Sequence, residues 1–73
     1  MRLNIETTNP AYVLECLKGL FINDDVKITN EYESTADFEI KPHGADERCE
    51  YVYPASWVTE LSVYVPIHKI RIY

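Results

Sequence analysis

Glycine is scarce in this chain: only Gly19 and Gly44 occur among its 73 residues, and neither lies in a phosphate-binding pattern. Nucleotide-binding loops of the Walker and Rossmann kinds need several closely spaced glycines, so both kinds are excluded. Long apolar runs are also missing, which excludes a membrane-spanning helix, and residues 1–6 contain no apolar segment typical of a signal peptide. We therefore expect a cytoplasmic protein without membrane contacts, located in the cytoplasm of the host cell if a phage encodes it.

Cysteine and histidine are few as well, and their positions argue against a metal site or a catalytic nucleophile. Structural zinc sites use closely spaced ligand pairs such as C-x2-C. The candidate ligands of this chain form no such pair; they are Cys16, His43, Cys49 and His68. Acidic residues surround Cys49 and disfavour the thiolate that a cysteine nucleophile requires. We therefore expect two reduced cysteines, no metal or other cofactor, no catalytic residue and no enzymatic activity.

Positive charge is in short supply, because 12 acidic residues oppose seven lysines and arginines and give a net charge of −5. Domains that bind duplex DNA are normally basic, since the neutralisation of phosphates supplies most of their affinity. The charge balance therefore argues against direct binding of nucleic acid or of an anionic membrane. Its electrostatic complement is a basic protein or a basic nucleoprotein complex.

What the chain does contain is typical of one small folded domain that spans residues 1–73. Hydrophobic residues make up 47% and charged residues 26% of the sequence, and both shares are close to globular averages. A domain this short leaves little volume for a deep pocket, so binding through a surface is favoured over enclosing a substrate. Six tyrosines and one tryptophan supply side chains that fill a small core or anchor an interface.

A helix over residues 10–22 is the clearest element in the pattern. Asn9 suits the N-cap of this helix, and Pro10 suits its first position. Apolar residues then recur with helical spacing, which indicates an amphipathic helix packed on a core; they are Val13, Leu14, Leu17, Leu20 and Phe21.

Alternating apolar and polar residues predict strands before and after this helix. The alternation covers residues 2–6, 26–32, 36–41 and 61–65, and further short candidates are 49–53 and 69–73. The short polar link after Tyr32 makes an antiparallel hairpin of the second and third strands, with Val26, Ile28 and Tyr32 on one face. The segment 54–60 fits no pattern, and a change of parity near Pro66 requires a bulge or a tight 3₁₀ turn.

These elements predict an α+β fold in which a single helix packs on a curled antiparallel β-sheet, in the order β-α-β-β-β-β. One helix cannot cover both sides of such a sheet, so it should pack on one face only. Partial closure of the C-terminal half into a barrel-like arrangement is the alternative.

Acidic residues are concentrated between residues 24 and 50, where nine carboxylates oppose three cations. Strand alternation points these acids outward, and we expect them to form a continuous negative surface. The predicted partner-binding residues are these acids and a tryptophan in the irregular segment: Asp24, Asp25, Glu31, Glu33, Asp37, Glu39, Asp46, Glu47, Glu50 and Trp57. The alternative for the acids is a solvated face that keeps a small protein soluble, and the alternative for Trp57 is core packing.

Three functions fit this sequence. The first is a non-enzymatic acidic protein-binding module that docks on a basic protein surface, such as a phage or mobile-element inhibitor of host machinery of the anti-CRISPR, anti-restriction or DNA-mimic type. The second is a small structural module that assembles as a homodimer through sheet edges. The third is a regulator that binds nucleic acid or a small ligand at the C-terminal edge through Lys69, Arg71 and Tyr73, although two cations are few for this purpose.

Overall fold

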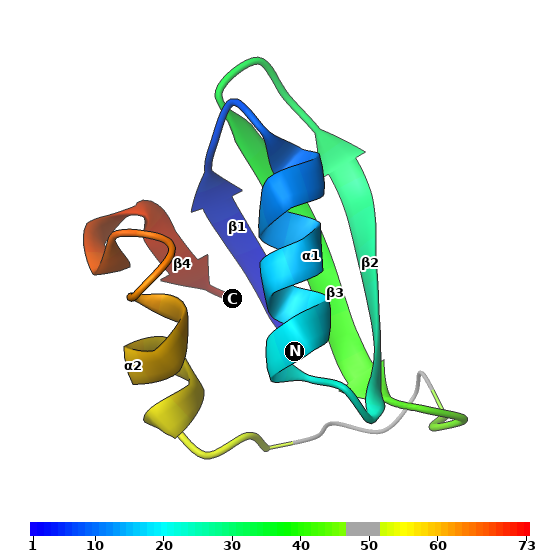
Figure 1. The fold of residues 1–73 in the computed structure, drawn as a ribbon. Coiled ribbons are helices and arrows are strands. Elements are labelled where there is room, and N and C mark those ends of the chain that lie inside the picture. The colour runs from blue at the N-terminus through cyan, green and yellow to red at the C-terminus, as the bar shows by residue number, and fades with distance from the viewer. Residues whose placement is uncertain (47–51) are drawn as a thin grey trace.

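A computed structural model describes residues 1–46 and 52–73 of the chain. Its elements are, in order, β1 (Arg2–Glu6), α1 (Pro10–Leu20), β2 (Asp24–Glu31), β3 (Thr35–Pro42), α2 (Ser56–Leu61), the 3₁₀ turn η1 (Ile67–Lys69) and β4 (Ile70–Ile72). The predicted α+β class is confirmed, with one main helix on a four-stranded antiparallel sheet (Figure 1). The sheet is open, with β2 and β4 at its edges, and it does not close into a barrel.

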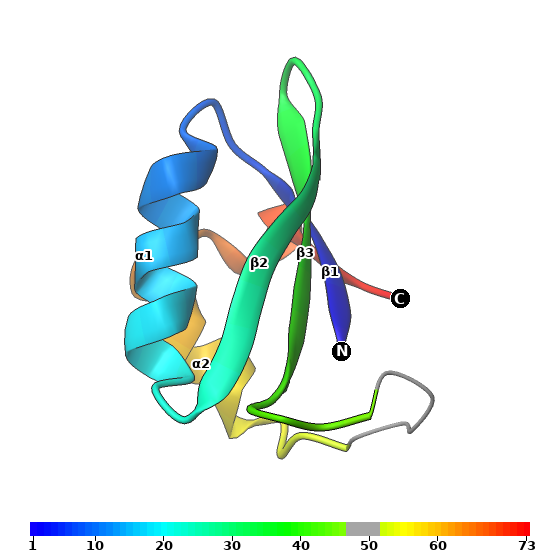
Figure 2. The same cartoon turned by 90° about the vertical axis from the view of Figure 1, so that its right-hand side faces the viewer.

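The strands lie in the order β2-β3-β1-β4, and every neighbouring pair is antiparallel. The element order β-α-β-β-α-β is that of the ferredoxin-like, or split β-α-β, arrangement. Both helices lie on the same side of the sheet, and no element of the described residues covers the other side (Figure 2). An arrangement of this kind indicates no particular function by itself.

Helix α1 begins where its capping residues predict. The Asn9 side chain accepts a hydrogen bond from the backbone N–H of Tyr12 at 3.3 Å, and Pro10 takes a first-turn position that needs no N–H. The helix ends at Leu20, slightly before the predicted end. The backbone N–H of Phe21 still donates to Leu17 at 2.8 Å, so it caps the helix before the chain turns into β2.

The hydrophobic core lies between the sheet and the two helices. Its buried members are Leu3, Ile5, Val13, Leu17, Phe21, Ala36, Phe38, Ile40, Trp57, Leu61 and Val65. The Phe21 ring makes an edge contact with Tyr53 at a centroid distance of 5.4 Å and a tilted contact with Trp57 at 6.1 Å. Trp57 is only 6% exposed, so it packs in the core, as the core-packing alternative predicts, and is not a surface anchor.

The predicted strand over residues 61–65 is wrong, and a second helix takes its place in the element order. Leu61 is the last residue of α2, and the chain continues in helical turns, since the backbone N–H of Val65 donates to Leu61 at 2.9 Å. Trp57, Leu61 and Val65 are spaced four residues apart, fall on one side of these turns and are all buried. Val63, which a strand would have pointed inward as well, is 77% exposed.

The last part of the chain follows the prediction more closely. The 3₁₀ turn that is one of the two predicted devices near Pro66 is present as η1. It leads from helical turns into β4 and corrects no change of strand parity, because residues 61–65 form no strand. Strand β4 then pairs with β1, which confirms a short final strand. Residues 49–51 of the candidate strand 49–53 lie outside the described residues, and Val52 and Tyr53 lie in no strand.

Strand β2 contains a bulge that the sequence does not reveal. Two steps along β2, from Ile28 to Asn30, correspond to a single step along β3, so Thr29 is an extra residue. The alternation reverses after the bulge, and Tyr32 turns away from the helices, where its hydroxyl reaches the Asp37 carboxylate at 3.2 Å. The prediction that Tyr32 shares a face with Ile28 is therefore wrong.

Candidate functional site

Among the described residues, the side of the sheet away from the helices, which we call the outer face, carries positive and negative side chains in equal number. Strand register places the following charged residues there, because their chain neighbours point into the core: Arg2, Lys27, Lys41, Arg71, Glu6, Asp25, Asp37 and Glu39. Opposite charges are neighbours across the strands, since Glu39 lies between Lys27 and Arg2 in the register. Asp25 likewise lies opposite Lys41. The outer face is therefore charge-balanced.

A hydrogen-bond network centred on Asp37 occupies the middle of the outer face. The Asp37 carboxylate accepts from the side-chain amide of Asn4 at 2.8 Å and from the Tyr32 hydroxyl at 3.2 Å. The Tyr73 hydroxyl donates to it at 3.4 Å, and Asn30 adds a further side-chain hydrogen bond. These bonds, the one from Asn4 first, lower the pKa of Asp37, and the charge of Asp37 raises the pKa of Tyr32. The network ties three strands and the residue after β4 together.

Two tyrosines of this network present their rings to solvent. Tyr32 is 57% exposed and Tyr73 is 75% exposed, although the hydroxyl of each is held by Asp37. Aromatic side chains that are already held in place lose little conformational entropy when a partner covers them. These two rings are therefore the best contact candidates on the outer face.

The net charge of the chain comes from residues outside this outer-face set. When its four acids and four cations are set aside, eight acids remain against three cations, and they account for the whole net charge of −5. Three of these residues, Glu47, Arg48 and Glu50, lie outside the described part of the chain. The described acids of this remainder are Glu15, Asp24, Glu31, Glu33, Asp46 and Glu60. The described cations are Lys18 and Lys69.

The described members of the nine predicted acids lie on three different parts of the molecule. The outer face holds Asp25, Asp37 and Glu39; the turn end of the β2–β3 hairpin, which we call the hairpin end, holds Glu31 and Glu33; the opposite end of these strands holds Asp24 and Asp46. Glu47 and Glu50 lie outside the described residues. The hairpin end lies at the same end of the molecule as the start of α1 (Figure 1). Two of the nine predicted acids therefore lie at the same end of the molecule as the start of α1.

An exposed ion pair lies at the opposite end of the hairpin. The His43 ring nitrogen Nδ1 lies 2.8 Å from Oδ1 of Asp25. The hydrogen bond and the charge of Asp25 raise the pKa of His43, and the same hydrogen bond lowers the pKa of Asp25. Because the His43 side chain is 83% exposed, the pair contributes little to stability.

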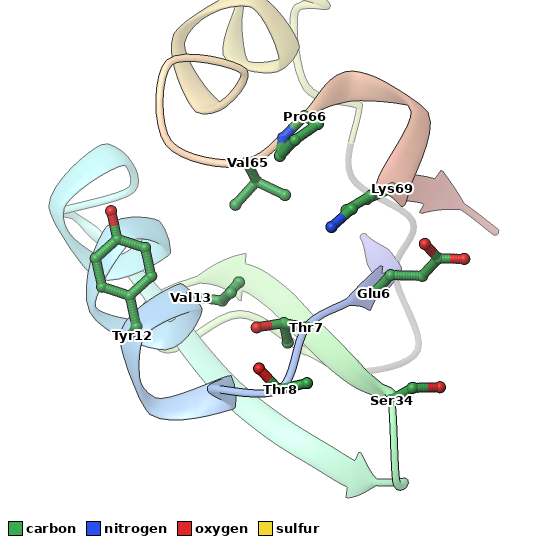
Figure 3. A pocket seen from close by; sticks show the side chains of 9 residues that line it. All are labelled: Glu6, Thr7, Thr8, Tyr12, Val13, Ser34, Val65, Pro66 and Lys69. Carbon is green, nitrogen blue, oxygen red and sulfur yellow. The ribbon is translucent and has the colours of Figure 1, made fainter.

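A groove of about 480 Å³ opens on the helix side, between the start of α1 and the chain that leads into β4. Val13 and Val65 form its apolar floor, the Tyr12 ring stands at one side, and the Lys69 side chain reaches in from another (Figure 3). The lining is completed by Glu6, Thr7, Thr8, Ser34 and Pro66. We call this hollow the α1–η1 groove.

Tyr12 lines this groove, and a second exposed tyrosine, Tyr64, lies close to Tyr12. Tyr12 is 49% exposed and Tyr64 is 56% exposed. A side-chain hydrogen bond with Cys16 raises the pKa of Tyr12, and Tyr64 is close enough to add to the same effect. Sequence reasoning missed the groove, because it forms only when residues 65–69 fold back beside α1, and the segment 61–65 was predicted as a strand.

The C-terminal cations that suggested a basic edge do not lie together. Arg71 belongs to the outer face, where its Nη2 lies 3.6 Å from Oε1 of Glu6. Lys69 instead lines the α1–η1 groove. The two charges therefore serve different surfaces and do not add up to one basic patch.

Chemistry other than binding has little support in the described residues. Within 1–46 and 52–73, no three histidine, cysteine or acidic side chains are grouped so that they could hold a metal ion. Cys16 is a half-buried free thiol. In the same two ranges, no helix combines the length and the apolar character needed to cross a membrane. Comparison of the chain with protein-family models, with curated proteins and with solved structures finds no match.

Proposed function

We propose that this chain is a non-enzymatic protein-binding module that docks on a basic surface of its partner. One observation carries the proposal: among the described residues, the acidic excess lies outside the charge-balanced outer face. Part of that excess, Glu31 and Glu33, lies at the hairpin end, beside the start of α1 and the α1–η1 groove. A negative surface beside exposed aromatic rings fits the docking of a basic protein.

Electrostatic steering favours the hairpin end over the outer face. Exposed charges act over about 10 Å at 0.1 M salt, so opposite charges that are cross-strand neighbours largely cancel at the distance of an approaching partner. On the outer face, Asp25 and Glu39 have such neighbours and Glu6 is paired with Arg71. The acids of the hairpin end, Glu31 and Glu33, have no cation beside them within residues 31–34. We therefore expect the partner to approach the hairpin end and the helix side.

The class of partner follows from the sign of this charge. Protein surfaces that normally hold nucleic acid are the most basic ones available, and carboxylates can imitate phosphates on them. Inhibitors of host machinery of the anti-CRISPR, anti-restriction or DNA-mimic type would act in this way. This narrower assignment is supported by size and charge alone, since fold and net charge do not specify a partner.

Affinity capture tests the proposal, with the tagged protein as bait in a lysate at low and at high salt and mass spectrometry as the readout. We expect a basic complex that is recovered at low salt and lost at high salt. The double variant Glu31→Lys and Glu33→Lys should lose this complex, because it reverses the sign of the charge at the hairpin end. The control Asp24→Lys and Asp46→Lys makes the same change in net charge at the opposite end and should keep it.

Two results would count against this proposal in different ways. Equal recovery by the wild type and by the hairpin variant would refute docking at the hairpin end. The absence of any basic partner at either salt concentration would refute the proposed function as a whole.

Assembly as a homodimer is a second candidate function, favoured by β4, one edge of which pairs with no other strand of the described residues. Tyr73 donates its backbone N–H to Arg2 at 3.1 Å, so alternation along the strand points the backbone N–H and carbonyl of Ile72 away from β1. Ile72 is also 56% exposed. Antiparallel pairing of two copies about Ile72 would satisfy these groups. Light scattering should then show a mass that rises with concentration and falls in Ile72→Pro, which lacks the donor; a constant monomer mass would refute assembly.

A further inference from the structure

We infer that the α1–η1 groove receives one apolar side chain of the basic partner, flanked in the partner by lysines or arginines. This inference rests on the proposed function, to which it adds a location and a partner chemistry. The groove lies on the helix side, close to the hairpin end. Its floor is apolar, its lining carries one acid and one cation, and the acids Glu31 and Glu33 lie at the neighbouring hairpin end.

The floor of the groove offers contacts that suit an aliphatic or aromatic side chain. Val13 and Val65 are 1% and 4% exposed, so their methyl groups belong to the core and leave only a small apolar surface at the groove. The Tyr12 ring, which is 49% exposed, stands beside them as a wall (Figure 3). An inserted side chain would cover these surfaces and lose its own contact with water. Buried anchors in a pocket of this kind carry much of the affinity of protein interfaces.

Hydrogen bonds fix the backbone on both sides of the groove before any partner binds. Val65 is held from one side, where its backbone N–H donates to Leu61 at 2.9 Å. On the other side, the backbone N–H of Thr7 donates to the carbonyl of Ser34 at 2.9 Å and ties the β1–α1 connection to the hairpin end. A groove with walls held in this way needs little ordering when it is filled, which favours affinity.

Charge around the groove favours positive residues on both sides of the anchor. Within the groove itself charge is balanced, because Glu6 is opposed by Lys69 and is paired with Arg71. The acidic excess comes from its surroundings, where Glu31 and Glu33 lie at the hairpin end tied to it and exposed Glu15 follows Tyr12 on α1. Lys69 is the only cation among the lining residues that the structure describes. Its aliphatic stem can lie along an apolar ligand while its ammonium group stays in water. A basic segment with one apolar residue therefore fits better than an acidic or a purely apolar one.

Three synthetic peptides test this inference by NMR titration of the isotope-labelled protein. They are a lysine-rich peptide with a central leucine, the same peptide with alanine in place of leucine, and a peptide with the leucine but with glutamates in place of the lysines. The leucine peptide should bind about tenfold more tightly than the alanine peptide, because its larger side chain buries more apolar surface. The chemical-shift changes that only the leucine peptide causes should occur at Tyr12, Val13 and Val65. The glutamate peptide should bind most weakly.

A variant that blocks the groove distinguishes the contribution of the groove to peptide binding from that of the acidic residues around it. Thr8→Trp places a large side chain at the groove from an exposed position, and it should remove the preference for leucine while the alanine peptide still binds. Thr29→Trp, an equally large change at an exposed position on β2, is the matched control and should keep the preference.

Each remaining outcome overturns a different part of the reasoning. Equal affinity for the leucine and alanine peptides would overturn the groove inference and leave docking on a basic partner untouched. Tighter binding of the glutamate peptide would overturn the charge argument on which both the inference and the proposed function depend.

Discussion

Truncation of Leu61 and truncation of Val63 should have very different effects on the free energy of unfolding, although both residues are aliphatic and close in sequence. Leu61 is 0% exposed at the end of α2, whereas Val63 is 77% exposed in the turn that follows. Replacing a buried leucine by alanine costs about 2–5 kcal/mol, because it removes apolar contacts and leaves a cavity. A substitution at the surface changes the free energy of unfolding by about 0.5 kcal/mol or less.

Val65→Ala supplies an intermediate reference, since Val65 is 4% exposed and follows Leu61 by one helical repeat. Loss of two buried carbon groups, at about 0.8 kcal/mol each, predicts a cost of at least about 1.6 kcal/mol. A domain of this length has a total stability of about 4–11 kcal/mol. Leu61→Ala should therefore remove a large part of it, and Val63→Ala almost nothing.

Urea unfolding followed by the fluorescence of Trp57 measures all three variants, because this ring is buried against Phe21 in the folded state. In a strand, Leu61, Val63 and Val65 would share the inward face, and Val63→Ala would cost as much as Val65→Ala. Similar losses for those two variants would refute the helical arrangement of residues 61–65. Unchanged slopes of free energy against urea would show that the differences belong to the folded state.

Three further predictions concern a helix cap and two ionisable groups. Asn9→Ala should lower the free energy of unfolding by about 0.5–2 kcal/mol, because it removes the acceptor at the start of α1; the neighbouring variant Thr8→Ala should have a smaller effect in the same urea assay. The pKa of Asp37 is lowered in the folded state, so its stabilisation is complete at pH values above its ordinary pKa and is lost as the pH falls through the folded value. Asp37→Asn should therefore weaken the loss of stability in acid, and an unchanged acid dependence would contradict the network. The pKa of His43 is raised, so the small stabilisation from its pair is complete below its ordinary pKa and is lost as the pH rises through the folded value. NMR titration of the ring should show that Asp25→Asn lowers the pKa of His43, and the same pKa in both proteins would contradict the pairing.

Helix α1 and strand β3 could be predicted from the sequence because the signals they need are local. Asn9 and Pro10 define the start of α1, and the capping hydrogen bond of Asn9 forms as its residue type indicates. Alternation in β3 assigns Phe38 and Ile40 to the core, where they are 1% and 0% exposed. In both elements, the residues that specify the structure are within a few positions of those that adopt it.

The segment 61–65 could not be predicted, because its pattern fits two structures. Leu61, Val63 and Val65 alternate as in a strand, while Trp57, Leu61 and Val65 recur at a spacing typical of a helix. A short apolar segment cannot decide between these periods by itself. The decision comes from packing, because the helical turns bury the ring of Trp57 against Phe21 of a distant segment.

The charge pattern of the outer face has the same limit. Alternation indicates that Asp37 and Glu39 point away from the core, but it does not indicate what lies beside them. Lys27 and Arg2 come to lie on either side of Glu39 only through the pairing of three strands, two of which are far apart in the sequence. A segment with a large acidic excess in the sequence therefore contributes to a balanced face in the folded chain, because register decides which charges are neighbours.

Strand β4 lies between the α1–η1 groove and the Asp37 network of the outer face. Lys69, directly before the strand, lines the α1–η1 groove, and Tyr73, directly after it, donates its hydroxyl to Asp37 on the outer face. The strand has only three residues, and β1 is its one neighbouring strand in the described part of the chain. The opposite edge strand, β2, also has one neighbour, but it is eight residues long. The shortest strand of the sheet therefore joins a residue that lines the groove to a residue of the Asp37 network.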